Sequence, residues 1–207
     1  MLQPIISGTP AADPSLILAS TSPYRRELLA RLCLPFVAIS PHIDETRREG
    51  ESAVVMVQRL ASEKARAVAV QHPLAWVIGA DQCAVLDNQV LGKPGTHERA
   101  FAQLRAASGR SVVFHTGLCL MCVEQGFERT VEVPFTVRFR NLSDAEIEHY
   151  LAKEKPYDCA GSFKSEGLGI ALFEALEGSD PSALIGLPLI ALCTLLREAG
   201  LNPLGTC

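Results

Sequence analysis

The segment from Leu16 to Leu29 constrains the fold more than any other part of the sequence. Its first four residues, Leu16–Ala19, form a short apolar run of the kind found in strands that are covered on both faces. Ser22 follows at a position suited to a helix N-cap, and Pro23 suits the first helical position. The segment therefore predicts a buried strand, a tight turn and a helix in immediate succession.

The start of this helix is a candidate anion-binding site. Ser20, Thr21 and Ser22 place three hydroxyl groups beside backbone N–H groups that have no helical partner, and such helix starts attract anions. Arg25 and Arg26 follow in the first turn, where cations oppose the helix dipole, so local stability does not explain them. A bound phosphate would explain them, but a capped surface helix with two solvated arginines accounts for the pattern equally well.

Length and composition limit the fold and the partners. The chain has 207 residues, which suits one large domain or two closely packed lobes, and 48% of them are hydrophobic. Charged residues make up 20%, too many for a membrane protein, and the most apolar stretch is interrupted by Gly186 and Pro188. The net charge of −4 argues against a general nucleic-acid binder, so an anionic substrate would need a local positive cluster.

The start of the chain and its cysteines bear on where the protein acts. Residues 1–14 contain Pro, Gly and Asp but no Lys or Arg, which predicts an irregular or disordered extension rather than a secretory signal. The seven cysteines are odd in number and scattered, so we expect no disulfide framework, and a reducing cytoplasm fits. No repeat or linker divides residues 15–207, which we expect to form a single domain.

A helix predicted from Ser52 to about Gln71 carries a lysine on its apolar face. With successive residues turned by about 100°, four apolar side chains form one stripe, and Lys64 falls in the middle of it. The stripe consists of Val57, Leu60, Ala61 and Val68. Lys64 can extend outward past this apolar surface, or it can deliver its ammonium group into a cleft, which its central position favours.

Two carboxylate positions are candidates for catalysis or metal binding. The apolar run Trp76–Ala80 predicts a buried strand that ends at Asp81, and ligands of open α/β sheets collect beyond the carboxyl ends of strands. Asp81 is therefore placed like a catalytic or metal-binding carboxylate, although an aspartate that caps the next turn is an equally good interpretation. Asp44 and Glu45 form a carboxylate pair in a charged loop, where most such pairs are simply solvated.

The middle and the end of the chain predict further elements of both kinds. These are a hairpin over 83–91, a helix over 96–107, strands over 111–123, 127–140 and 169–173, and helices over 143–153 and 187–199. Lys93 follows the hairpin between Gly92 and Pro94, in a stiffened loop whose backbone can approach a ligand.

The segment 159–167 is a candidate wall of a binding site. If it is extended, Ser162, Lys164 and Glu166 face one way, and glycines bracket that polar face. A glycine-rich hairpin explains the same pattern about as well.

Seven short motifs occur along the chain in a familiar order. They are Ser-Pro-Tyr-Arg-Arg at 22–26, Asp-Glu at 44–45, Ser-Glu-Lys-Ala at 62–65, Gly-Ala-Asp-Gln at 79–82, Gly-Lys-Pro at 92–94, Ala-Gly-Ser-Phe-Lys-Ser-Glu-Gly at 160–167 and Gly-Leu-Pro at 186–188. Together they resemble the Maf family of nucleotide pyrophosphatases, from about Leu16 to the end of the chain. Each motif alone is weak, and their shared order makes the resemblance strong.

The resemblance implies a fold and a reaction. Members of the family are similar in fold to inosine-triphosphate pyrophosphatases, so we expect an α/β fold in which a long twisted mixed β-sheet and its flanking helices form two lobes around a cleft. They convert a nucleoside triphosphate and water to the monophosphate and pyrophosphate. They use a divalent metal cation, so Mg²⁺ or Mn²⁺ is the expected cofactor.

Matched position by position, the resemblance also implies roles for individual residues. Asp81 takes the place of the catalytic base, and Glu45 joins it on the metal side. The expected substrate-binding residues are Ser20, Arg25, Arg26, Lys64, Lys93 and Lys164. The chemistry agrees, because Arg25, Lys64 and Lys93 supply three cations near a triphosphate of roughly four negative charges, and one Mg²⁺ would complete the neutralisation.

Three further positions resemble the branch of the family that hydrolyses 7-methyl-GTP. Tyr24, Gln82 and Glu166 are the expected specificity residues. The dTTP/UTP branch tends to carry Thr and Gln in place of Gln82 and Glu166, and tryptophan is often found where Tyr24 stands. A dTTP/UTP pyrophosphatase and a nucleotide-binding regulator with little turnover stay open as alternatives. The expected partner is the nucleoside triphosphate, without nucleic acid or membrane, and a homodimer is one option for the assembly.

Overall fold

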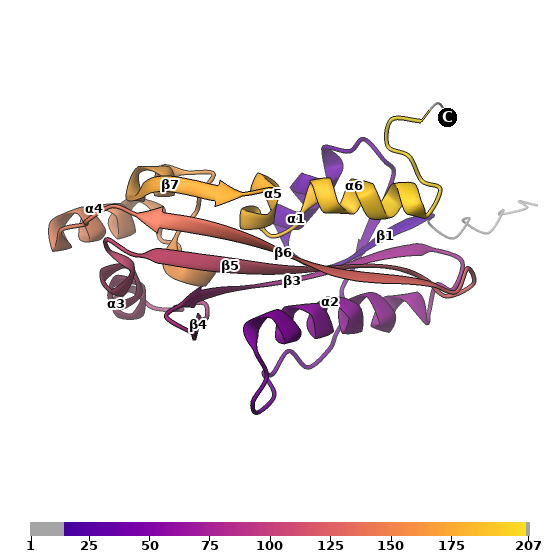
Figure 1. The fold of residues 1–207 in the computed structure, drawn as a ribbon, viewed down its shortest axis with the longest axis horizontal. Coiled ribbons are helices and arrows are strands. Elements are labelled where there is room, and N and C mark those ends of the chain that lie inside the picture. The colour runs from indigo at the N-terminus through magenta and orange to yellow at the C-terminus, as the bar shows by residue number, and fades with distance from the viewer. Residues whose placement is uncertain (1–14, 206–207) are drawn as a thin grey trace, which may run out of the picture.

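A mixed β-sheet with helices on both faces forms the described part of the chain, residues 15–205 of the computed structural model (Figure 1). The strands are β1 (Leu16–Ala19), β2 (Val37–Ile39), β3 (Trp76–Leu86), β4 (Gln89–Leu91), β5 (Ser111–Cys122), β6 (Phe127–Phe139) and β7 (Phe173–Gly178). The helices are α1 (Pro23–Ala30), α2 (Ala53–Ala69), α3 (His97–Ala107), α4 (Asp144–Glu154), α5 (Pro181–Ile185) and α6 (Leu189–Glu198), with 3₁₀ turns η1 (Ala160–Ser162) and η2 (Leu168–Leu172). The extension predicted over residues 1–14 lies outside the described residues.

The strand order is β2-β1-β3-β5-β6-β7, and β4 pairs with β3. β1 runs parallel to β2 and β3, whereas β3, β5, β6 and β7 are antiparallel neighbours. This confirms the expected mixed sheet. The long strands β3, β5 and β6 run along the length of the molecule, with α3 and α4 gathered toward one end and α1, α2 and α6 toward the other (Figure 1).

One side of β3 is left open between two short neighbours. β1 pairs with β3 only at residues 76–78, and β4 pairs with it only at residues 84–86. On the other side, β5 pairs with β3 continuously from Val77 to Val85. Among the described residues, no strand therefore pairs with residues 79–83 on the open side, and we call this gap the β3 notch.

The predicted end of this strand at Asp81 is wrong. β3 continues to Leu86, because residues 82–85 pair with β5 from a distant part of the chain. The parallel neighbour β1 is the strand that ends before Asp81 is reached, because its last residue is Ala19. Asp81 therefore lies within a long strand, in the middle of the β3 notch.

Helix α2 packs directly on one face of the sheet, opposite the face covered by α1, α5 and α6 (Figure 1). Gly79 and Gly117 make this close approach possible. A Cβ atom on Gly79 would collide with the carbonyl oxygen of Ala61, and one on Gly117 with that of Val57. The two glycines thus set the height of α2 above the strand that carries Asp81.

We expect Gly79→Ala to lower the free energy of unfolding by roughly 1–3 kcal/mol, because the added methyl group overpacks the interface between the sheet and α2. Urea denaturation measures this change. Gly92→Ala is the matched control, since a Cβ atom there meets nothing within 4 Å. Equal stability of the two variants would contradict the close packing of α2.

Side-chain caps begin the helices where the sequence predicts them. The Ser22 hydroxyl accepts a hydrogen bond from the Arg25 backbone N–H and so caps α1. Ser52 caps α2 in the same way, and Ser143 forms a reciprocal capping box with Glu146 at the start of α4. These local predictions are confirmed.

The segment 159–167 is not extended, which corrects the prediction of one polar face. Gly161 and Ser162 have φ angles of +73° and +63°, so the chain turns within η1. Ser162 is buried and donates its hydroxyl to Gln103, and Phe163 packs among the rings of an aromatic cluster. That cluster contains Phe114, Phe139 and Phe173. Burial of Phe163 explains why the regular alternation fails here.

One prediction near the end of the chain, the strand over 169–173, also needs correction. Residues 168–172 form the turn η2 rather than a strand, because Gly169 packs against the backbone of Lys164, where no side chain would fit. The strand in this region is β7, which begins only at Phe173. None of the helices within residues 15–205 has the length and apolarity needed to cross a bilayer.

Candidate active site

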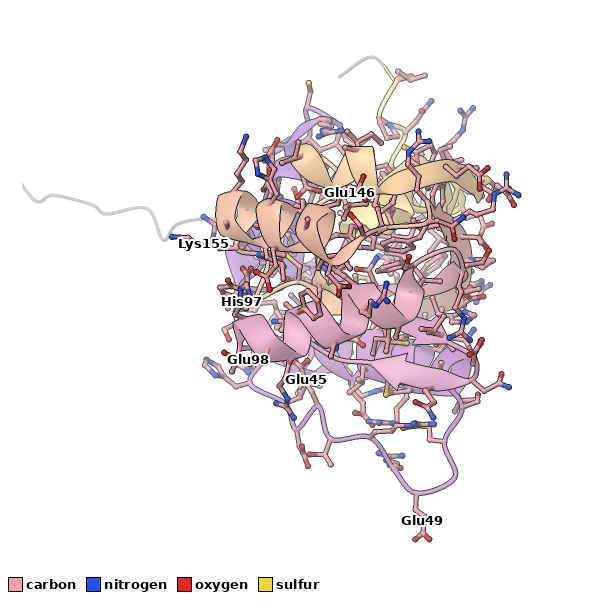
Figure 2. All side chains as sticks on the ribbon, turned by 90° about the vertical axis from the view of Figure 1, so that its left-hand side faces the viewer. Glu45, Glu49, His97, Glu98, Glu146 and Lys155 are labelled. Atoms are coloured by element: carbon pink, nitrogen blue, oxygen red, sulfur yellow. The ribbon has the colours of Figure 1, made fainter. Side chains whose placement is uncertain are left out.

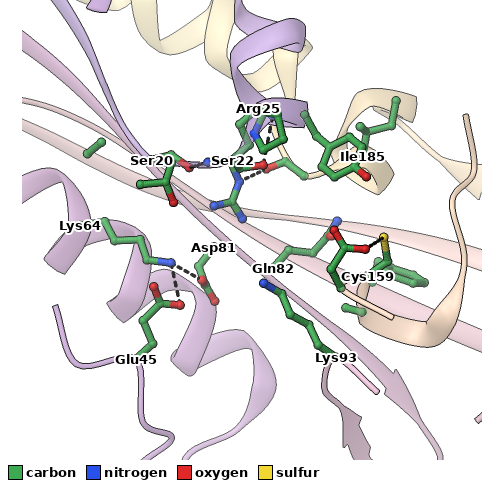
Figure 3. A pocket seen from close by; sticks show the side chains of 18 of the residues that line it. Ser20, Ser22, Arg25, Glu45, Lys64, Asp81, Gln82, Lys93, Cys159 and Ile185 are labelled. Atoms are coloured by element: carbon green, nitrogen blue, oxygen red, sulfur yellow. Dashed lines mark hydrogen bonds and ion pairs between the residues drawn. The ribbon is translucent and has the colours of Figure 1, made fainter. Parts of the chain in front are cut away.

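A pocket of about 480 Å³ opens at the β3 notch (Figure 3). Its walls come from the β1–α1 turn, the loop before α2, α2 and β3, the loop after β4, the segment 158–166 and the end of α5. Of the residues singled out in the sequence, the pocket is lined by Ser20, Tyr24, Arg25, Glu45, Lys64, Asp81, Gln82, Lys93 and Glu166. The fold thus brings together side chains from six of the seven sequence motifs, and Gly186 of the seventh lines the same pocket.

Lys64 links the two candidate carboxylates. Its Nζ atom lies 2.7 Å from Asp81 Oδ1 and 3.1 Å from Glu45 Oε2. The side chain of Lys64 is only 6% exposed, so it does not extend past the apolar stripe to solvent. It delivers its ammonium group into the pocket, which was the favoured interpretation. One ammonium between two carboxylates leaves a net charge of −1, which would attract a further cation.

The β1–α1 turn supplies polar groups opposite this cluster. The Ser20 hydroxyl accepts a hydrogen bond from the Ser22 backbone N–H at 3.1 Å. Arg25 donates its Nε–H to the Gly186 carbonyl oxygen at 2.8 Å, and Figure 3 shows its guanidinium extending toward the centre of the pocket. Burial lowers the pKa of Arg25, while the negative charges of Asp81 and Glu45 act in the opposite direction. Arginine stays protonated under such conditions, so the pocket holds a fixed cation there.

Gln82 follows Asp81 in β3 and points to the opposite face of the sheet. Its amide nitrogen donates to the carbonyl oxygens of Ala183 and Leu184, at 2.6 and 3.1 Å, and contacts the Thr116 hydroxyl oxygen at 3.1 Å. These acceptors fix the orientation of the amide, because only its NH₂ group can satisfy them. The carbonyl oxygen of Gln82 is therefore the group left to accept a hydrogen bond from a ligand.

An aromatic ring and two carboxylates lie at the other end of the pocket. Tyr24, Asp158 and Glu166 all line it, together with Cys159. Burial is the main cause that raises the pKa of Tyr24 to about 12, and the neighbouring acidic groups add to it. The phenol is therefore neutral at physiological pH. Cys159 belongs to the segment 159–167 that the sequence marked as a candidate wall, whereas sequence reasoning missed Asp158, which lies one residue before that segment.

A family profile described as "Maf-like protein" matches residues 15–199. The chain belongs to this family. Proteins named 7-methyl-GTP pyrophosphatase are similar over most of their length. The one from Nitrosococcus oceani is 59% identical over 91% of this chain and 95% of its own. Those from Albidiferax ferrireducens and Pseudomonas syringae pv. syringae are 56% and 59% identical, covering 96% and 98% of their own lengths.

Among solved structures, the Staphylococcus aureus Ham1 protein is a distant neighbour of this Maf-like chain. The match covers 61% of this chain and 72% of the Ham1 chain, with 14% sequence identity and a TM-score of 0.44.

Two of the predicted substrate-binding residues of the Maf-like chain do not line the pocket. Arg26 is exposed on α1, one position beyond Arg25 and therefore on a different side of the helix. Lys164 turns toward α4, where its Nζ atom lies 3.4 Å from the Glu154 carbonyl oxygen. Its neighbours Phe163 and Ser165 line the pocket instead.

Helix α4 holds the segment that carries Glu166. The Tyr150 hydroxyl accepts a hydrogen bond from the Lys164 backbone N–H, and the Glu154 carboxylate accepts one from the Leu168 backbone N–H. A Cβ atom on Gly167 would lie 2.8 Å from Glu154 Oε1, so a larger residue there would displace that carboxylate. These contacts fix the two ends of the turn that presents Glu166.

Glu45 and Asp81 are the residues that could hold a metal ion. Within residues 15–205, no three His, Cys, Asp or Glu side chains form a group that could bind one on their own. Mg²⁺ is commonly bound by one or two carboxylates together with the phosphates of a nucleotide and water. The pair of carboxylates therefore fits the oxygen ligands that a hard divalent cation prefers.

Proposed function

We propose that this Maf-like protein hydrolyses 7-methyl-GTP to 7-methyl-GMP and pyrophosphate. The observation that carries the proposal is the contact of Lys64 with both Asp81 and Glu45, in a pocket whose other walls supply Arg25 and Lys93. Cations suit a triphosphate, and a carboxylate among them suits the activation of water. The names of the relatives supply the substrate.

The reaction is a displacement at the α-phosphorus. Asp81 orients a water molecule and accepts its proton, and the water oxygen forms a bond to the α-phosphorus. The bond from this phosphorus to the oxygen that bridges it to the β-phosphate breaks, and that oxygen leaves with pyrophosphate. Arg25, Lys64 and Lys93 stabilise the charge that builds up on the phosphates.

A divalent metal ion is part of the proposal. Glu45 and Asp81 would hold it, and Mg²⁺ or Mn²⁺ suits their oxygen ligands. When bound, such an ion neutralises phosphate charge and polarises the phosphoryl oxygens. Lys64 then keeps the two carboxylates in place between turnovers.

A panel of nucleotides tests the reaction and the substrate together. Pyrophosphate release is measured with 7-methyl-GTP, GTP, UTP and dTTP in the presence of Mg²⁺ or Mn²⁺. We expect 7-methyl-GTP to give the highest kcat/KM. A preference for UTP or dTTP would replace the substrate but keep the reaction, whereas tight binding without release would make the protein a nucleotide-binding regulator.

Recognition of the base is assigned to Tyr24, Glu166 and Gln82. Methylation at N7 gives guanine a delocalised positive charge, which favours an aromatic face and a nearby carboxylate. The carboxylate of Glu166 can also accept N–H bonds from the Watson–Crick edge of the base, and the Gln82 carbonyl oxygen offers a further acceptor at the pocket edge. Asp158 adds negative charge at the same end.

We expect Glu166→Gln to reduce the preference for 7-methyl-GTP over GTP by about 10-fold, because it removes the charge and keeps the shape. The measurement is the ratio of kcat/KM for the two nucleotides. Glu174→Gln is the matched control, since Glu174 lies on β7, pairs with Arg138 of β6 and does not line the pocket. An unchanged ratio would show that Glu166 does not read the base.

We further propose that the protein works in the cytoplasm. The six cysteines within residues 15–205 are all free, as a reducing compartment allows. Cell fractionation with an antibody to the protein tests the location, and recovery in an oxidising compartment would contradict it.

A further inference from the structure

The loop that carries Glu45 is held in place by charged groups with little exposure, although it has no regular secondary structure. It connects β2 to α2, and Figure 2 shows it projecting from the body of the molecule, with Glu49 at its tip. Glu45 lies on this loop and must meet Lys64, which comes from α2. The contacts that fix the loop therefore decide whether Glu45 reaches the site.

The buried carboxylate of Glu51 links the end of the loop to helix α2. Its side chain is only 5% exposed, and its two oxygens accept hydrogen bonds from Arg59 Nε at 2.6 Å and Nη2 at 2.8 Å. The same carboxylate accepts a hydrogen bond from the Arg48 backbone N–H at 3.1 Å. Hydrogen bonding to Arg59 is the main cause that lowers the pKa of Glu51 to about 2. The carboxylate is therefore charged throughout the neutral pH range.

Arg59 extends these contacts to the residue next to Glu45. Its Nη2 atom donates to the Thr46 carbonyl oxygen at 3.2 Å, and its Nη1 atom donates to Glu63 at 2.9 Å. Arg59 and Lys64 belong to the same helix, α2. One helix thus presents both the guanidinium that holds the loop backbone and the ammonium that receives the Glu45 carboxylate.

We propose that the Glu51–Arg59 pair positions Glu45 for the reaction. The pair holds the loop so that the Glu45 carboxylate meets Lys64 beside Asp81, and neither Glu51 nor Arg59 lines the pocket. Both are positioning residues that act through Glu45. The kinetic test of this proposal rests on the proposed hydrolase function, whereas the test by trypsin digestion rests on the loop geometry alone.

Kinetics of Glu51→Gln test the proposal through a double-mutant cycle. We expect kcat to fall about 10- to 100-fold, because a displacement of about 1 Å in a catalytic group has effects of that size. In a Glu45→Gln background, the same substitution should cause no further loss, because its target is already gone. An equal loss in both backgrounds would overturn the proposal.

Arg59→Lys is a second, milder variant, which keeps the charge but gives up the planar fork that reaches three partners at once. We expect a smaller fall in kcat than for Glu51→Gln and the same lack of additivity with Glu45→Gln. Arg66→Met is the matched control, because Arg66 pairs with Glu128 on the exposed side of the same helix. A fall in kcat for Arg66→Met as large as for Arg59→Lys would overturn the role of the pair.

Limited digestion with trypsin tests the loop without any nucleotide. Arg47 and Arg48 lie in the loop and offer cleavage sites that the contacts with Glu51 restrain. We expect Glu51→Gln to be cleaved there at least several-fold faster than the wild type, with no change for Arg66→Met. Unchanged cleavage would overturn the positioning role. Faster cleavage in a protein that hydrolyses none of the four nucleotides would support the loop contact and refute the proposed function.

Discussion

Replacing Asp81 with asparagine should lower turnover by at least ~100-fold, the scale expected when a general base is lost. Asparagine keeps the shape of the side chain but does not accept a proton from water. The fold and the affinity for nucleotide should be largely kept, because the neighbouring cations still face the phosphates. Single-turnover pyrophosphate release measures the loss, and calorimetric titration with a nucleotide measures the affinity.

Asp87→Asn is the matched control for this experiment. Asp87 lies in the turn between β3 and β4, and its side chain is 63% exposed. The Asp87→Asn variant should release pyrophosphate at the wild-type rate. If Asp81→Asn did the same, Asp81 would not be the base, and another group would have to activate the water.

Replacing Lys64 with methionine should lower both stability and turnover. The change leaves the carboxylates of Asp81 and Glu45 facing each other without the ammonium between them. Breaking a buried pair in this way costs up to about 3 kcal/mol, and water in the pocket reduces the cost. The double variant Lys64→Met with Asp81→Asn should regain part of the stability and none of the activity. Urea denaturation and steady-state kinetics give the two quantities.

Two comparisons separate a catalytic from a structural role of Lys64. Lys153→Met, in the exposed last turn of α4, should change neither quantity. A Lys64→Met protein with normal kcat/KM and reduced stability would show that the ammonium only holds the carboxylates apart. Reduced kcat/KM with normal stability would place its contribution entirely in contacts with the substrate.

The sequence predicts best where the decisive contacts are local. Ser22 and its first helical turn lie within a few residues of each other, so the cap of α1 could be predicted. The position of Lys64 within an apolar stripe also follows from neighbouring residues on one helix, and it correctly favoured the cleft. The motif order then identified which of these local features belong to one pocket.

Features that depend on distant partners could not be predicted in this way. The continuation of β3 past Asp81 depends on pairing with β5, and the orientation of Gln82 depends on carbonyl groups of α5. Lys164 and Arg26 were assigned to the site by their motifs, yet neighbours in the same motifs occupy the pocket instead. The turn at Gly161 and Ser162 reverses the alternation on which the prediction for 159–167 relied.

The β3 notch has a consequence for how the protein moves during a catalytic cycle. Asp81 and Gln82 lie on a strand that β5 holds along its whole far side, so they belong to a stiff part of the molecule. Glu45, Lys93 and Glu166 come from irregular segments around the rim. If the protein hydrolyses nucleotides as proposed, we expect any movement during substrate entry and product release to occur in these rim segments rather than in the strand that carries Asp81.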